Sequence, residues 1–239
     1  MPFIVLEGLD GAGKSTQIKR LQTLLADSGR DYEYLHFPRF DAPVYGDLVA
    51  RFLRGELGAA DEVNPYLVAL IYAGDRQQAA PMIRAWLEAG KFVIIDRYVV
   101  SNIAYQCAKC TDPARREALR EWILELEYGV NGIPRPDITL FLDVPFRFTE
   151  KKLTEQREGD DRGYLQGKCD IHESSLALQR AVREVYLDEA RRSAAPQART
   201  PGDRVEVVGC GDAAGNMLPP DAIFDKIREK ILSLLGTGR

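Results

Sequence analysis

The sequence is poor in cysteine and histidine, has no long apolar run and carries no excess of positive charge. Its 239 residues include only four cysteines, too few for a disulfide scaffold, so a reducing compartment is expected. The formal net charge of −4 excludes a basic field over the whole surface that would hold nucleic acid without specificity. The longest apolar runs, 92–95 and 138–144, are far shorter than the roughly 18 residues that span a bilayer, so no membrane partner is expected.

Length and composition are typical of one globular domain, and the N-terminal residues do not resemble a secretory signal. The chain is about 1.6 times a 150-residue guide length, which fits a single domain over residues 1–239 with an inserted lid. Its 45% hydrophobic and 28% charged residues exclude wholesale disorder. No basic segment precedes the apolar residues 3–6, and no small-residue cleavage site follows them. We expect a cytoplasmic protein, with a nuclear or organellar location left open.

Three cysteines and one histidine raise the alternative of a zinc site. Two residues separate Cys107 from Cys110, and two separate Cys169 from His172. Together they would supply four ligands if the fold brought them together. Because such spacing is weak on its own, we favour ordinary, partly buried thiols.

Short β-rich runs alternate with helical patterns along the chain. The predicted strands are residues 3–7, 31–36, 91–96, 138–143 and 204–208. Ile18, Leu21 and Leu25 repeat at helical spacing after the first strand, and Gly29 ends that helix. The other predicted helices are residues 42–53, 65–90, 101–108, 113–128, 146–156, 174–192 and 221–235. This alternation predicts a three-layer α/β fold, in which helices flank a mostly parallel, five-stranded sheet.

The strongest motif follows the first strand directly. Residues 8–15, GLDGAGKS, match the phosphate-loop pattern G-x-x-x-x-G-K-[ST] between a predicted strand and a predicted helix. Its glycines let backbone N–H groups approach phosphates, and the helix N-terminus adds a positive dipole. The expected ATP-binding residues are Gly8, Gly11, Ala12, Gly13, Lys14, Ser15 and Thr16. Lys14 would reach the β- and γ-phosphates, and the Ser15 hydroxyl would bind Mg²⁺.

Two buried strands end in an acidic residue, Glu7 and Asp96. In parallel sheets ligands bind at the carboxyl ends of the strands, so both acids are expected at the edge of the site. Asp96 would orient the water shell of Mg²⁺, and Arg97 would extend its planar guanidinium into the same cleft. An Asp-Arg pair is often only an ion pair, but its position here favours a functional role.

Several further segments, taken with this loop, resemble the thymidylate kinase family. They are GLDGAGKST at 8–16, FPR at 37–39, LIYAGDR at 70–76, DRY at 96–98 with Ser101 and Asn102, and PDITLFLD at 136–143. Their order and spacing agree from Phe3 to about Leu235. The resemblance implies a P-loop kinase fold, a homodimer, and Mg²⁺-dependent transfer of the ATP γ-phosphate to dTMP, giving dTDP and ADP.

The resemblance also implies roles for single residues. Those expected to bind the substrate are Asp10, Arg39, Tyr72, Arg76, Arg97, Ser101, Asn102, Tyr105, Gln106 and His172. Asp10 would contact the 3′-hydroxyl of the deoxyribose, and Tyr72 would stack on the base, with Tyr105 as a second aromatic wall. Arg39, Arg76 and Arg97 would hold the monophosphate and the edge of the base.

The catalytic residues implied are Lys14, Asp10, Arg97, Arg157 and Arg162. A phosphate acceptor is already ionised near neutral pH, so the reaction needs positive charge more than a general base. Gly11 follows Asp10, so the phosphate loop itself offers no arginine. Residues 157–168 are predicted to be a mobile loop within a lid at about 154–168, whose Arg157 and Arg162 would close over ATP.

Three alternatives remain open. The first is another nucleoside or nucleoside monophosphate kinase, the second is a nucleotide-dependent switch, and the third is a relative without catalytic activity. A guanine-binding switch should contain an Asn-Lys-x-Asp segment, and the sequence has none. Loss of catalytic loop residues would mark an inactive relative, but Lys14, Ser15, Asp96 and Arg97 are all present.

Overall fold

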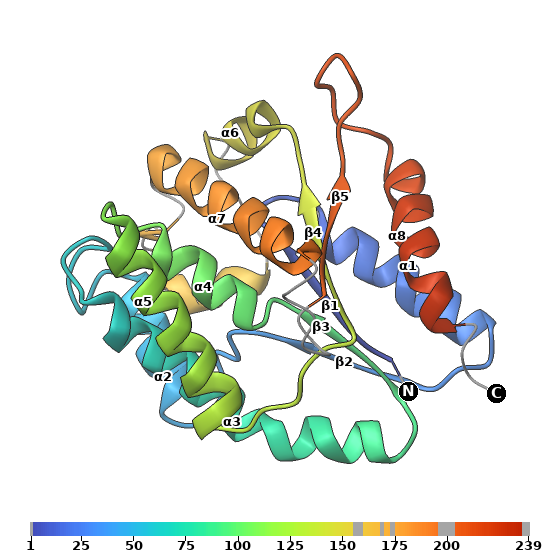
Figure 1. Cartoon of the computed structure of the whole chain (residues 1–239), viewed down its shortest axis with the longest axis horizontal. Coiled ribbons are helices and arrows are strands. Elements are labelled where there is room, and N and C mark those ends of the chain that lie inside the picture. The colour runs from blue at the N-terminus through green and yellow to red at the C-terminus, as the bar shows by residue number, and fades with distance from the viewer. Residues whose placement is uncertain (1, 155–159, 168–169, 173–174, 196–203, 236–239) are drawn as a thin grey trace.

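The computed structural model describes residues 2–154, 160–167, 170–172, 175–195 and 204–235. Its centre is a five-stranded parallel sheet with the strand order β2-β3-β1-β4-β5 (Figure 1). The strands are β1 (Phe3–Gly8), β2 (Tyr32–His36), β3 (Phe92–Asp96), β4 (Ile138–Asp143) and β5 (Val205–Gly209). Each predicted strand is present within one or two residues of its expected bounds, which confirms the α/β fold.

Three helices of the described residues begin at a side-chain cap. The helices are α1 (Lys14–Asp27), α2 (Tyr45–Leu53), α3 (Pro65–Glu88), α4 (Val99–Cys107), α5 (Pro113–Leu124), α6 (Phe146–Thr154), α7 (Leu176–Ala194) and α8 (Pro220–Leu235). The side chain of Asn64 accepts a hydrogen bond from the backbone of α3, and Asp112 and Ser175 do the same for α5 and α7. No described helix is both long and apolar enough to cross a membrane.

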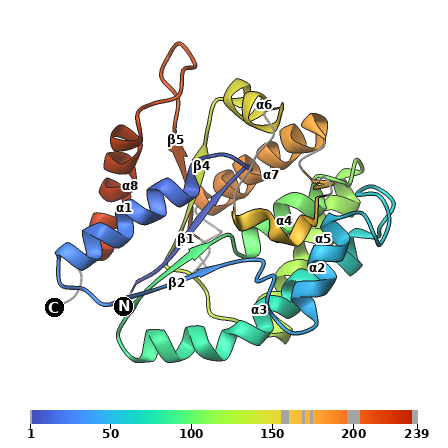
Figure 2. The same cartoon turned by 180° about the vertical axis from the view of Figure 1, so that it is seen from behind.

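Apolar cores cover both faces of the sheet. On one face, Ile18 and Leu21 of α1 pack with Ile223 and Ile227 of α8. The core on the other face is built from α3, α4, α5 and α7 (Figures 1 and 2). The central strand β1 is buried along its whole length, so the loop that follows it begins from a rigid position.

Two predicted segments differ from the structure. The helix expected over 113–128 is α-helical only to Leu124 and continues as a π-helix, η1 (Glu125–Val130). The loop expected over 157–168 contains a short 3₁₀-helix, η2 (Asp160–Leu165). This helix forms because Leu165 is buried and Tyr164 stacks on Phe40, with ring centroids 3.9 Å apart.

The cysteines that the structure describes are free thiols. Cys107 and Cys210 are buried and Cys110 is partly buried. Burial raises the pKa of both Cys107 and Cys210 to about 12. No group of three or more possible metal ligands occurs among the described residues, and Cys169 lies outside them.

Candidate active site

The phosphate loop connects β1 to α1 through two left-handed glycines. Gly11 has φ 75° and Gly13 has φ 82°, a region that other residues adopt only with strain. Gly13 is the N-cap of α1, and no side chain caps the helix there. The N–H groups of the first turn are therefore available to an anion.

Lys14 lies beneath this loop and is almost fully buried. Its Nζ donates to the carbonyl oxygens of Gly8 and Leu9, at 3.3 and 3.4 Å, and lies 4.0 Å from Oδ1 of Asp96. Burial lowers the pKa of Lys14, and the charge of Arg97 lowers it further. The ammonium group is therefore poorly solvated in the absence of phosphate, and an anion in the loop would stabilise it.

Asp96 ends β3 beside the loop with its carboxylate almost fully buried. Oδ2 lies 3.3 Å from Nδ1 of His36, and Oδ1 has no hydrogen-bond partner among the described residues. Burial alone would raise the pKa of Asp96, but Lys14 and His36 together lower it. Asp96 is thus an ionised acid with one oxygen available at the phosphate site.

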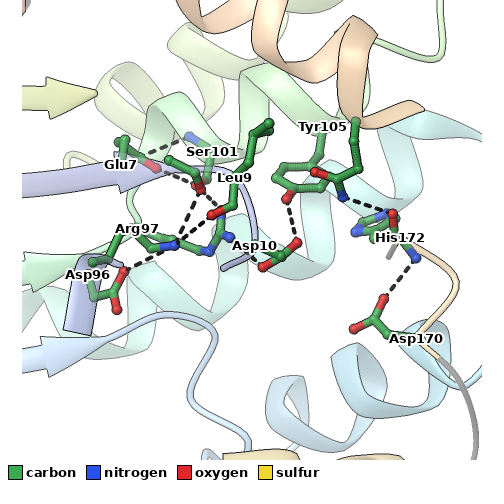
Figure 3. Close-up of polar contacts among 12 residues, drawn as sticks. Glu7, Leu9, Asp10, Asp96, Arg97, Ser101, Tyr105, Asp170 and His172 are labelled. Atoms are coloured by element: carbon green, nitrogen blue, oxygen red, sulfur yellow. Dashed lines mark hydrogen bonds and ion pairs between the residues drawn. The ribbon is translucent and has the colours of Figure 1, made fainter. Parts of the chain in front are cut away.

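Arg97, Asp10 and Tyr105 form one network (Figure 3). Nη2 of Arg97 donates to Oδ1 of Asp10 at 2.7 Å, and the Tyr105 hydroxyl donates to Oδ2 at 2.8 Å. Arg97 has φ 66°, an uncommon conformation that turns its side chain toward the loop. Burial raises the pKa of Tyr105 well above its usual value, and the charge of Asp10 adds to this. The phenol therefore stays a donor at neutral pH.

Two further predicted arginines, Arg39 and Arg76, also pair with carboxylates. Nε of Arg39 donates to Oδ1 of Asp75 at 2.8 Å, and the Arg39 backbone N–H donates to Oδ2 at 2.8 Å. Arg76 is buried and donates through Nε and Nη2 to Glu127. Both arginines are held in fixed positions before any substrate is present.

A single cavity of about 1070 Å³ brings these groups together. The predicted site residues that line it are Asp10, Gly11, Ala12, Gly13, Lys14, Ser15, Arg39, Tyr72, Arg76, Asp96, Arg97, Ser101, Asn102, Tyr105, Gln106 and His172. Gly8 and Thr16 are not part of its wall. The volume is at the upper end of the range for ligand sites, and residues distant in sequence converge on it.

The predicted lid is only partly described. Arg157 lies outside the described residues, and Arg162 belongs to η2. Gly163 and Tyr164 of the same helix line the cavity, and the Tyr164 hydroxyl donates to Asp170 at 2.8 Å. The segment therefore packs at the edge of the site.

Comparison with known proteins identifies the family of this chain. A family model described as thymidylate kinase matches residues 6–196. The chain belongs to the thymidylate kinase family. Thymidylate kinase from Mycobacterium tuberculosis is 33% identical over 224 residues, covering 92% of this chain and 98% of that protein. A probable thymidylate kinase from Thermococcus kodakarensis is 35% identical over 191 residues, covering 77% and 82%.

The fold also matches a solved structure of this family. Thymidylate kinase from Candida albicans superposes with a TM-score of 0.71 at 25% identity, covering 98% of this chain and 92% of that one. The chain is accordingly a nucleotide kinase that uses ATP as the phosphate donor.

The cations of the described site are paired with acids, in keeping with the acidic total of the chain. Each cation of the described site has a carboxylate neighbour. The pairs are Lys14 with Asp96, Arg39 with Asp75, Arg76 with Glu127, and Arg97 with Asp10. Together with these carboxylates, the four cations carry little net charge. These positive groups act through fixed geometry at short range, not through a broad positive potential.

Two buried acids that contact residues of the cavity were not assigned a role from the sequence. Glu7 is fully buried and accepts hydrogen bonds from Ser101 (Figure 3) and from Tyr98 and Tyr186. Its position directly before Gly8 placed it at the edge of the site but gave no partner. Glu127 had no sequence signal, because its neighbours come from other elements.

His172 is buried against Tyr105, with ring centroids 4.9 Å apart. Its backbone N–H donates to Oδ1 of Asp170 (Figure 3), and its Nε2 has no hydrogen-bond partner among the described residues. Burial lowers the pKa of His172 to about 3, and the charge of Lys109 contributes. The imidazole is therefore neutral at physiological pH.

Mild acid should destabilise the protein through His172. Its pKa is about 6.5 in the unfolded chain and about 3 in the fold, so between these values only the unfolded chain binds the proton. The free energy of unfolding should fall by about 2 kcal/mol between pH 7.5 and pH 5 from this residue. His172→Phe should lack this loss in urea unfolding at the two pH values.

The chain has only two histidines, so NMR provides a direct check. The imidazole signal that disappears in His172→Phe should not titrate between pH 7.5 and pH 5 in the wild-type protein. A midpoint inside that window would contradict the burial argument.

Proposed function

We propose that this chain transfers the γ-phosphate of ATP to dTMP. The observation that supports this most strongly is the single cavity in which the phosphate loop, with its Asp10, faces Arg97 and Tyr105. An oxygen of the dTMP phosphate attacks the γ-phosphorus, and the bond from that phosphorus to the β–γ bridging oxygen breaks. ADP leaves as dTDP forms. Because the attacking oxygen is ionised near neutral pH, no general base is required.

Each part of the cavity has a proposed role in this reaction. Lys14 and the loop N–H groups bind the β- and γ-phosphates, and Arg39 and Arg97 hold the phosphate of dTMP in line. Asp10 contacts the sugar, and Tyr72 stacks on the base, with Tyr105 as a second aromatic wall. Several side chains on the far wall contact the polar atoms of the base: Arg76, Ser101, Asn102, Gln106 and His172. The lid arginines, Arg157 and Arg162, supply further positive charge at the γ-phosphate, and the contact of η2 with the cavity supports this role.

We also propose that Ser15 and Asp96 are the residues that would hold Mg²⁺. Both are hard oxygen donors beside the cavity, and Oδ1 of Asp96 has no hydrogen-bond partner among the described residues. One or two protein oxygens are typical of a site whose other ligands are phosphates and waters. Bound Mg²⁺ would neutralise charge on the β- and γ-phosphates.

An acceptor screen tests the kinase activity. Purified protein with MgATP should form ADP and dTDP from dTMP, and dTMP should be preferred over dCMP, dGMP and AMP. ADP formation is followed by a coupled assay and dTDP by chromatography. Absence of turnover with every monophosphate would refute the kinase proposal, and a preference for another base would refute its thymidylate specificity.

A homodimer is proposed from the surface of α3. Leu67 and Leu70 are 58% and 46% exposed, and Tyr66 and Met82 on the same helix are also exposed. Such a row of large apolar side chains is unusual on a monomer and suits an interface. Sedimentation equilibrium should give about twice the 26.8 kDa of one chain. The cytoplasmic location stays a prediction.

A further inference from the structure

Glu127 is a fully buried acid that the reaction itself does not use. It lies on the π-helix η1, which places one carboxylate inside the protein behind the cavity wall. Glu127 does not line the cavity, but both of its described side-chain partners, Arg76 and Asn102, do. It is therefore placed to act on a bound base only through these two side chains.

The hydrogen bonds of Asn102 fix the orientation of its amide. Nδ2 donates to Oε1 of Glu127 at 3.0 Å and to the carbonyl oxygen of Ala69 at 3.1 Å. Both neighbours are acceptors, so the amino group must face them and the amide cannot be flipped without losing both bonds. The buried Oδ1 of Asn102 has no hydrogen-bond partner among the described residues.

Because its amino group is already engaged, Asn102 can offer a ligand only its side-chain oxygen, Oδ1, which is an acceptor. A pyrimidine that hydrogen-bonds to Oδ1 must therefore present an N–H donor to it. Thymine has N3–H, whereas cytosine has an unprotonated N3 with a lone pair. Arg76, held by Glu127 through Nε and Nη2, is a pure donor and suits a base carbonyl such as O4 of thymine, not the amino group of cytosine.

We propose that Glu127 is a specificity-determining residue, which selects thymine over cytosine by fixing the amide of Asn102 and the guanidinium of Arg76. The proposal rests on the proposed dTMP kinase activity and adds a positioning residue to it. Glu127 does not touch the base. Its buried carboxylate determines which polar atoms of Arg76 and Asn102 face the bound base.

The test compares Glu127→Gln with the wild-type enzyme, measuring kcat/KM for both dTMP and dCMP. An amide at 127 can donate to Asn102 as well as accept, so a flipped Asn102 amide would lose only its bond to Ala69 and could present its amino group to N3 of cytosine. We expect the dTMP-to-dCMP ratio to fall by roughly tenfold or more. A merely structural role would lower both values equally, and an unchanged ratio would overturn the proposal.

Glu125 provides the matched control, because it is an exposed glutamate on the same π-helix. Glu125→Gln should retain the wild-type ratio, and a fall equal to that of Glu127→Gln would overturn the assignment to Glu127. If Glu127→Gln does not fold, the double variant Arg76→Met with Glu127→Leu leaves no buried charge and should fold. Its ratio should also fall, and a wild-type ratio there would refute the proposal.

The outcomes separate the two proposals. Wild-type protein without dTMP turnover would refute the proposed function. Wild-type turnover with an unchanged ratio in the folded variants would refute only the role of Glu127.

Discussion

Replacing Lys14 by methionine should lower kcat for phosphoryl transfer by about a hundredfold to a thousandfold. The transition state places negative charge on the oxygens of the transferred group, and Lys14 is a buried cation within the phosphate loop. A fixed charge at such a site acts without the reorganisation that water would require. Methionine keeps the apolar stem and removes only the charge.

The loss should be catalytic, not structural. Burial removes most of the solvent from the Lys14 ammonium group, which is why its pKa is lowered. An apolar side chain in its place should therefore cost the free protein little stability. The melting temperature of Lys14→Met should stay within a few degrees of the wild type. Lys19 lies exposed on the same helix, and Lys19→Met serves as the control with normal kcat. A Lys14→Met enzyme within tenfold of the wild-type rate would contradict the assignment.

Those parts of the fold that depend on local pattern were predictable. Continuous apolar runs predicted the buried strands β1 and β3, and the helical spacing of Ile18, Leu21 and Leu25 predicted α1. The phosphate loop was predictable for the same reason, since its glycines, lysine and serine are adjacent in sequence. The resemblance added the side chains that α4 brings to the cavity.

What the sequence could not provide are the partners of charged groups across elements. Arg76 and Glu127 are 51 residues apart, and Arg97 and Asp10 are 87 apart. These pairs exist only after the helices have packed. The π-helix η1 departs from the predicted helix where Glu127 meets Arg76, so its local geometry accompanies a tertiary contact. The same holds for η2, where Tyr164 and Leu165 find apolar neighbours.

Replacing Glu7 should have the largest effect on stability. Helix α4 has no side-chain cap of its own, because Tyr98 occupies its N-cap position. Glu7 from β1 acts as the cap, since Oε1 accepts from the backbone N–H groups of Tyr98 and Ser101 at 2.8 and 3.1 Å. Oε2 accepts from the hydroxyls of Ser101 and Tyr186. Loss of this carboxylate leaves several buried donors unsatisfied.

Glu7→Ala should therefore lower the free energy of unfolding by roughly 3 kcal/mol or more, since each unsatisfied buried donor costs about 1–3 kcal/mol. Glu7→Gln should lose less, because its amide oxygen still accepts while its amino group opposes other donors. Tyr186→Phe removes a single hydroxyl and should cost about 1 kcal/mol. Urea unfolding of the three variants tests this order.

The same series should affect substrate binding, because α4 carries Ser101, Asn102 and Tyr105 to the cavity. A helix whose first turn is no longer fixed to β1 holds these groups less precisely, and about 1 Å of misplacement is enough to cost a hundredfold in rate. KM for dTMP should thus rise in the order Tyr186→Phe, Glu7→Gln, Glu7→Ala, with KM for ATP changing less. Equal changes in both KM values would mean that Glu7 stabilises the fold as a whole and does not position α4.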